Sequence, residues 1–207
     1  MELKYKNWNE VPITVYRRIR EASEIENPTE RQVAIVAALC DATEDEVWNL
    51  SVTEAGSLAG RTNWVWDFDF DKSHRIKTLK IDGQVYEINY EVGKMSIAAY
   101  VDFQNYYKNR DDNMGLLLTT FIIPKGYKYG EGYDPVELAK KFEDNISITA
   151  YDNILYFFVR ASLDSIKATV IYLELMAKET ERLTGTPLPK EIQEKMSQIA
   201  DLFGSLS

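Results

Sequence analysis

The chain has 207 residues, a net charge of −9 and a pI near 4.8. Its hydrophobic share of 45 % is ordinary for a globular protein, and its acidity disfavours duplex nucleic acid as a partner, because phosphates would be repelled. The sequence contains no apolar run of about eighteen residues, so we expect no membrane span. The single cysteine, Cys40, allows no disulfide within the chain, which fits a reducing intracellular compartment.

Helix-start signatures dominate the first part of the chain. Asn27 is a good cap for a helix that has proline at its first position. Thr43 and Ser51 each precede a glutamate by three residues, which is the capping-box pattern. Together with apolar residues at helical spacing, these signatures predict four helices over residues 12–62, of which the third is very short.

The pattern then changes to that of strands. Polar and apolar residues alternate over residues 75–81 and again over residues 84–90, on either side of Asp82-Gly83. An Asp-Gly pair between alternating runs is a strong hairpin signal, because both turn positions need a positive φ. Residues 64–70 also alternate, so we expect a third strand there, with its tryptophans and phenylalanines inward and its aspartates in water.

Helical periodicity returns in the second half of the chain, where residues 148–183 predict one long helix. Its apolar residues lie most of the way around, which is typical of a helix central to the core. Leu163-Asp164-Ser165 is a candidate break in it. The other expected elements are a helix capped by Ser96, an apolar segment at 114–123, an ordered loop at 125–134, a helix capped by Asp134 and a final amphipathic helix at 188–203.

These elements predict an α+β fold that is predominantly α-helical. We expect a helical N-terminal block over residues 1–72, followed by a central β-hairpin and a helical C-terminal region over residues 73–207. The two regions either stand apart or join into one compact domain.

One pattern in the sequence suggests a metal site. Asp67, Asp69 and Asp71 have the spacing of the first three ligands of a calcium-binding loop. That loop also requires glycine at its sixth position and glutamate at its twelfth, where this chain has Lys72 and Thr78. We therefore expect solvated aspartates and no metal.

Two further patterns suggest catalysis or phosphate binding only weakly. Cys40 and His74 are the sole candidates for a nucleophile–base pair, but Cys40 lies on an apolar helix stripe and His74 is expected to be exposed. Gly126, Gly130 and Gly132 lack the lysine and the flanking elements of a phosphate loop. The sequence thus predicts no catalytic residue and no cofactor.

Aromatic residues make up 12 % of the chain, which is somewhat high. Tyrosine and tryptophan suit surfaces that are apolar on one side and wet on the other, although an aromatic-rich core is the plainer interpretation. The candidate partner-binding residues are Trp48, Trp64, Trp66, Tyr127, Tyr129 and Tyr133.

Several segments together carry a resemblance to a protein family. In the N-terminal block these are VAIVAALC at residues 33–40, TEDEV at 43–47 and LSVTE at 50–54. They resemble the core of the tail-assembly chaperones of tailed bacteriophages. Further along, IDGQVY at 81–86, AYVDFQ at 99–104, IPKG at 123–126 and YGEGYD at 129–134 are similar to an extension found in phages of Bacteroidetes. The likeness spans roughly residues 12–180.

The resemblance implies a non-enzymatic protein that works in the cytoplasm of an infected bacterium. Such chaperones coat the tape-measure protein and recruit tail-tube subunits, and the family has no catalytic residues to transfer. The added hairpin and C-terminal helices depart from the simplest family pattern. They leave open a structural component of the virion, either a neck, tail or cargo protein, that associates with copies of itself. An enzyme of unfamiliar type around the 124–134 loop is the third alternative. For a chaperone, we expect an apolar groove near residues 28–40 and 52–62 that accepts a partner helix.

Overall fold

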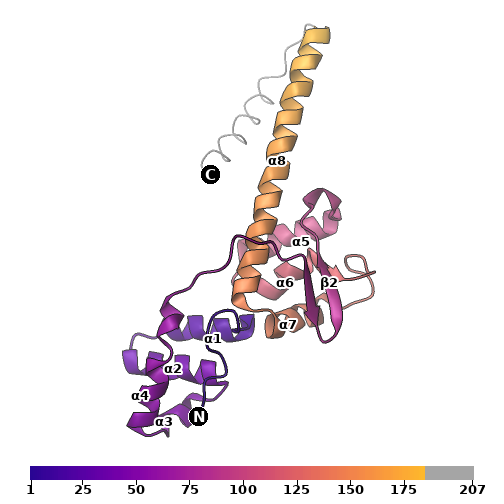
Figure 1. Cartoon of the computed structure of the whole chain (residues 1–207). Coiled ribbons are helices and arrows are strands. Elements are labelled where there is room, and N and C mark those ends of the chain that lie inside the picture. Colours follow the sequence, from indigo (N-terminus) through magenta and orange to yellow (C-terminus); the bar gives the residue numbers. More distant parts are fainter. Residues whose placement is uncertain (185–207) are drawn as a thin grey trace. The chain divides into compact units, whose positions relative to one another are not determined.

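The computed structural model describes residues 1–184 and confirms the predominantly helical α+β fold (Figure 1). The described part contains eight α-helices, two short 3-10 helices and one antiparallel sheet. No helix in residues 1–184 is long and apolar enough to cross a membrane. The predicted final helix at 188–203 lies outside the described residues.

The chain divides into two compact units. The first contains residues 1–88 and 96–156, and the second contains residues 89–95 together with the chain from residue 157 onward. The boundary that the sequence suggests after residue 72 stays a prediction.

Four helices form the N-terminal helical block of the first unit, as predicted. Asn27 accepts hydrogen bonds from two backbone N–H groups of the second helix, and both capping boxes, at Thr43 and Ser51, are present. Each cap satisfies backbone donors that would otherwise have no partner within the helix. The helices are α1 (Ile13–Ser23), α2 (Pro28–Cys40), α3 (Glu44–Trp48) and α4 (Val52–Gly60).

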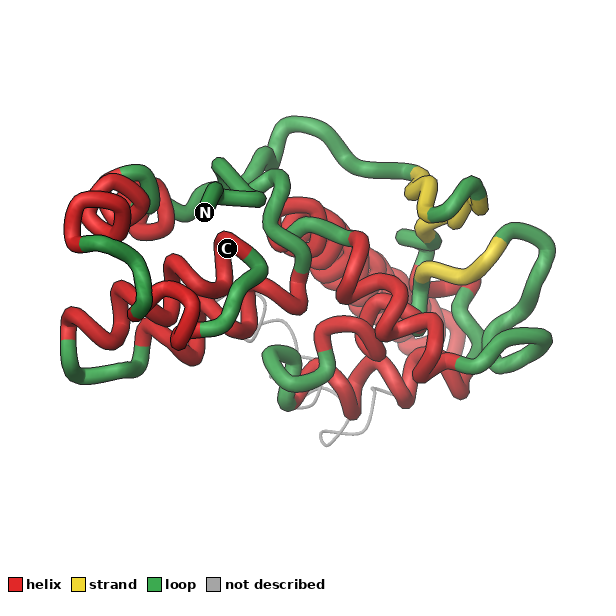
Figure 2. Tube along the Cα trace, turned by 90° about the horizontal axis from the view of Figure 1, so that it is seen from below, coloured by secondary structure: helices red, strands yellow, loops and turns green. Residues whose placement is uncertain are grey.

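The predicted hairpin is confirmed in its turn and its register. Strand β1 (Thr78–Ile81) pairs with β2 (Gln84–Ile88), and Ile81 lies opposite Gln84 across the two-residue turn. Asp82 has φ of 50° and Gly83 has φ of 79°, which are the positive values that this tight turn requires. Both strands lie in the first unit, and Figure 2 draws the strands in yellow.

The third strand was predicted in the wrong place. The structure assigns β3 to Ile122–Pro124, which pairs with β2, whereas Asn63–Trp66 forms the 3-10 helix η1 and residues 67–77 have no paired strand. Alternation over residues 64–70 does not produce a strand there, because the Trp64 ring packs against Trp8 and holds a tight turn. The expected apolar segment at 114–123 accordingly splits into a short helix and this strand.

The core of the first unit is densest around α6 (Met114–Thr119), α7 (Pro135–Asn145) and the start of α8 (Ile148–Thr184). Gly115 lets α6 approach α7, because a Cβ there would lie 2.6 Å from the Ala139 carbonyl oxygen. Leu117, Phe142 and Ile154 are completely buried. The helical core predicted for this half of the chain is therefore present at the beginning of α8.

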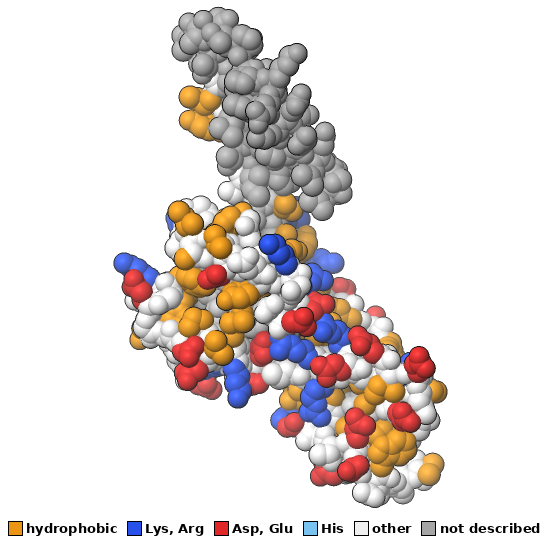
Figure 3. All heavy atoms as spheres, turned by 180° about the vertical axis from the view of Figure 1, so that it is seen from behind, with side chains coloured by type: hydrophobic (Ala, Val, Ile, Leu, Met, Phe, Trp, Pro, Cys, Tyr) orange, Lys and Arg blue, Asp and Glu red, His pale blue; other side chains and the backbone are white. Residues whose placement is uncertain are grey.

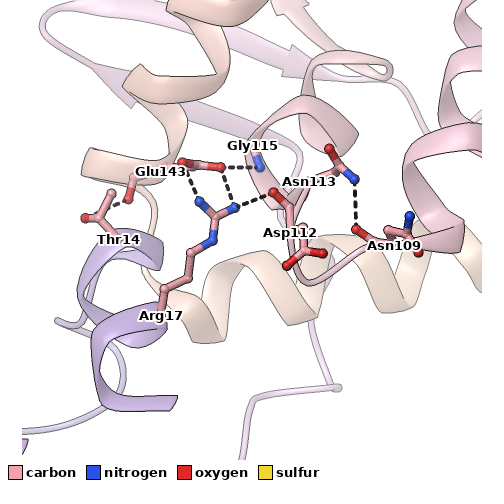
Figure 4. A network of polar contacts seen from close by, with 7 residues as sticks. All are labelled: Thr14, Arg17, Asn109, Asp112, Asn113, Gly115 and Glu143. Atoms are coloured by element: carbon pink, nitrogen blue, oxygen red, sulfur yellow. Dashed lines mark hydrogen bonds and ion pairs between the residues drawn. The ribbon is translucent and has the colours of Figure 1, made fainter. Parts of the chain in front are cut away.

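An ion pair joins this core to the N-terminal helical block (Figure 4). Both terminal nitrogens of Arg17 in α1 donate to the Glu143 carboxylate, at 2.7 and 2.9 Å. Arg17 also donates to the Asp112 carbonyl, and Glu143 accepts from the Gly115 backbone N–H at 3.0 Å. The side chains of Arg17 and Glu143 are only 25 % and 17 % exposed, so solvent screens the pair weakly.

The remaining described elements of the chain include α5 (Ile97–Lys108), capped by Ser96 as predicted, and η2 (Val92–Lys94). Helix α8 is continuous through Leu163-Asp164-Ser165, so the candidate break is absent. Within the second unit its side chains at Tyr172, Leu175 and Met176 are exposed, which differs from the expectation of a core helix along its whole length.

Candidate partner-binding surface

Trp48 is one of the predicted partner-binding residues that the fold leaves exposed. It is the last residue of α3, and 51 % of it is exposed. Val52, the first residue of α4, is 91 % exposed. Tryptophan exposed on a helical surface is typical of the anchors that dominate binding energy in protein interfaces. The α3–α4 turn therefore leaves two apolar side chains exposed to solvent.

Trp64 and Trp66 have opposite environments although they are two residues apart. The Trp64 ring contacts Trp8 edge to face, with ring centroids 5.2 Å apart, and the Phe68 ring contacts Trp8 edge to face at the same centroid distance. The indole nitrogens of Trp8 and Trp64 are both buried, and neither has a hydrogen-bond acceptor among residues 1–184. Trp64 thus belongs to an internal aromatic cluster, whereas Trp66 is 61 % exposed.

The three loop tyrosines are used largely within the chain. The Tyr129 hydroxyl donates to Asp102 of α5 at 2.7 Å, and burial together with this carboxylate raises the pKa of Tyr129 well above its usual value. The Tyr133 hydroxyl accepts from the Gly130 backbone N–H. Tyr127 packs on Gly132, where a Cβ would lie 2.5 Å from its ring, and remains 47 % exposed. The loop at 125–134 is thus ordered, as predicted, and held against its own unit.

The aspartates of the calcium-like pattern cap local turns. Asp69 accepts a hydrogen bond from the Phe70 backbone N–H, and Asp71 accepts from the backbone N–H of Ser73. Within residues 1–184 no three histidine, cysteine or acidic side chains come together as metal ligands would. The segment is fixed to α8 by Asn153, which is buried and donates to the carbonyls of Asp71 and His74.

The cysteine and the histidine lie in different surroundings. Cys40 ends α2 and is half-buried, and burial raises the pKa of its thiol, which keeps it protonated. The His74 side chain is 88 % exposed, as expected, and its Nδ1 lies 2.6 Å from the Ser73 hydroxyl.

Gly126, Gly130 and Gly132 have φ of 90°, 77° and 77°, so these glycines make turns of the loop possible.

Asp152 is a residue that sequence reasoning missed. It lies in the first turns of α8, where burial raises the pKa of its carboxyl to about 6, with Arg110 lowering it and Asp111 raising it. Nearby, Arg20, Tyr107 and Asp111 line an open cleft of about 630 Å³. The Arg20 guanidinium forms an ion pair with the Asp111 carboxylate at 3.0 Å, so these two charges in the cleft already have each other as partners. The only sequence signal for Asp152 is that it is an acidic residue within an otherwise apolar helical segment.

The groove expected near residues 28–40 and 52–62 is partly closed. Six consecutive residues of α2, from Ala34 to Leu39, are buried, so its apolar surface is covered within the first unit. Gln32 of α2 donates to the Thr62 hydroxyl beyond the end of α4, at 2.9 Å, which ties the two helices together. What stays open is the outer face of α4.

Comparison of the chain with protein families, with curated proteins and with solved structures found no match.

Proposed function

We propose that this chain is a non-enzymatic assembly protein that binds another protein through its N-terminal helical block. The observation that carries the proposal is the exposure of Trp48 and Val52, at 51 % and 91 %, on well-capped helices. Capped helices hold these side chains in place without a partner, so little order has to be created on binding. Such preorganised apolar anchors favour stable recognition of a protein surface.

The specific role that the sequence resemblance supports is that of a tail-assembly chaperone in an infected bacterium. Its partner would be a phage structural protein of the tape-measure or tail-tube type, bound in the host cytoplasm. The mainly helical fold is compatible with this role. The exposed α3–α4 turn supplies a surface on which a partner helix can dock.

A structural component of the virion is the second candidate. It is favoured by the exposed Tyr172, Leu175 and Met176 of α8, which recur at the spacing of one helix face. Such a face suits association with copies of the same chain. Mass spectrometry of purified particles separates the two roles, because a chaperone is absent from finished particles whereas a structural component is present in fixed copy number.

The test of the main proposal is affinity capture of the full chain from infected cells, with wild type compared with Trp48→Ala. We expect one phage structural protein in the wild-type eluate and roughly tenfold less of it with the variant, because truncation removes an interface anchor. Val136→Ala is the matched control, since Val136 is 67 % exposed on α7. Recovery of the wild-type chain alone throughout infection would contradict the proposal.

A further inference from the structure

Strand β1 has one open edge. The sheet has the order β1–β2–β3, so β1 pairs with β2 on one side and with no described strand on the other. The Lys77 carbonyl accepts from the Ile88 backbone N–H at 3.1 Å, and inward and outward backbone groups alternate along an antiparallel hairpin. The backbone groups of Thr78 and Lys80 therefore point away from β2, and no described residue outside the sheet bonds to them. Such an edge can accept a further strand.

The open edge of β1 is positively charged. Lys77 directly precedes the strand and Lys80 lies within it, and both side chains are exposed. Neither forms an ion pair with any residue of 1–184. By contrast, basic side chains lie next to acidic ones over the middle of the face drawn in Figure 3. Lysines on an open edge oppose pairing with a second basic strand, including β1 of another copy, and favour an acidic one.

The chain itself contains an acidic segment with the pattern of a strand. Aromatic and acidic residues alternate over residues 66–70, which we call the acidic segment. Asp67 and Asp69 are exposed and have no basic partner among the described residues. Trp66 and Phe68, which alternate with them, are 61 % and 40 % exposed. The backbone N–H and C=O of Phe68 form no hydrogen bond within the described part of the chain.

The acidic segment does not pair with β1 of its own copy. The Phe68 ring is held against Trp8, with ring centroids 5.2 Å apart. Just beyond the segment, the buried Asn153 of α8 donates to the Asp71 carbonyl. These contacts fix the segment on the first unit, outside the three-stranded sheet. A strand-like acidic segment and a basic strand edge thus exist in one copy without meeting each other.

We propose that the acidic segment of one copy adds to the open edge of β1 in a second copy, as a fourth strand of the sheet. Backbone hydrogen bonds to Thr78 and Lys80 supply the pairing, and the aspartates of the segment face the two lysines. Charge makes the contact selective: two β1 edges repel each other, as do two acidic segments, whereas one of each attracts. The inference goes beyond the proposed function, because it concerns contact between copies and does not use Trp48.

Exchange of charges between two variants tests the proposal on the full chain by sedimentation equilibrium. We expect wild type to self-associate. Lys77→Glu/Lys80→Glu and Asp67→Lys/Asp69→Lys should each raise the dissociation constant at least about tenfold, because the edge and the segment then carry the same charge. Mixed in equal amounts, the two variants should associate about as tightly as wild type, since each supplies the charge that the other lacks.

Lys128→Glu/Lys140→Glu is the matched control. It changes the net charge by the same amount as the edge variant, at two exposed positions outside the contact, and should associate as wild type does. Thr78→Pro tests strand pairing itself, because proline removes an N–H that points to the open edge and leaves every charge unchanged. It should also weaken association at least about tenfold. Melting temperatures establish that each variant is folded.

A wild type that remains monomeric up to about 0.1 mM overturns the proposal. So does a mixture of the two charge variants that fails to associate, or a control variant that loses association as the edge variant does. Association that folded Thr78→Pro leaves unchanged also overturns it, because the contact then does not use the backbone edge. Capture of a partner through Trp48 is measured separately, so the proposed function stands or falls independently of these results.

Discussion

Helices α4 and α6 are both short and rich in small and apolar residues, yet their glycines have opposite surroundings. A Cβ on Gly115 of α6 would lie 2.6 Å from a carbonyl oxygen of α7, whereas a Cβ on Gly56 of α4 would meet nothing within 4 Å. Five of the six residues of α6 are buried, but only Leu58 is buried in α4. The same residue type thus serves packing inside the unit in one helix and leaves a face open in the other.

Contacts within the first unit explain the residues of α6, but they do not explain those of α4. Around α6, Gly115, the Arg17–Glu143 ion pair and the buried leucines all make their contacts within the first unit. Around α4, an exposed valine, an exposed glycine and a nearby tryptophan have no such account within the described residues. The first region is explained by folding stability, whereas the second is part of the surface that we propose binds another protein.

Gly115→Ala is expected to have the largest effect on stability. The added methyl group would overlap the Ala139 carbonyl and the Glu143 side chain, so α6 and α7 would have to separate. We expect a loss of roughly 3 kcal/mol in the free energy of unfolding, measured by urea denaturation. A loss below about 0.5 kcal/mol would mean that the two helices adjust easily and that the close approach does not matter.

Asp152→Asn tests how a partly buried carboxyl at the start of α8 affects stability. Because burial raises the Asp152 pKa from 3.8 to about 6, the folded chain binds more protons than the unfolded chain between these values. The contribution of Asp152 to stability is therefore fully present below pH 3.8 and is lost as the pH rises through about 6. The shift corresponds to at most about 3 kcal/mol, less after solvent screening.

Asparagine at this position cannot ionise, so the variant should gain stability relative to wild type as the pH rises from 4 to 7. Paired denaturation curves at several pH values measure this difference, in which the contributions of the other carboxylates cancel. Parallel pH profiles for wild type and variant would show that Asp152 titrates normally.

Gly56→Ala is expected to have the smallest effect and the opposite sign to Gly115→Ala. Alanine fits the open space and favours the helix, so the free energy of unfolding should rise by about 1 kcal/mol. Thermal unfolding of the two alanine variants side by side measures the contrast directly. If both substitutions destabilise the chain, Gly56 is needed for folding and the face of α4 is not open.

Local patterns were sufficient where the determining contacts lie within a few residues. Asn27, Thr43 and Ser51 cap their helices as predicted, because the donors that each satisfies are two or three positions away. The Asp82-Gly83 turn is likewise fixed by its own dihedral angles. The third strand could not be placed in this way, since β3 depends on pairing with a strand more than thirty residues earlier in the chain.

The candidate surface shows the same difference between features set by local contacts and features set by distant ones. Exposed Trp48 and half-buried Trp64 look alike in the sequence, and the contact of Trp64 with Trp8 distinguishes them. The capped helices, the hairpin turn and the acidic stretch around α3 and α4 could be predicted from the sequence, because they follow from neighbouring residues. That Gly115 is covered, that Gly56 is open and that Asp152 is partly buried could not be predicted, because burial depends on which distant segments of the chain pack together.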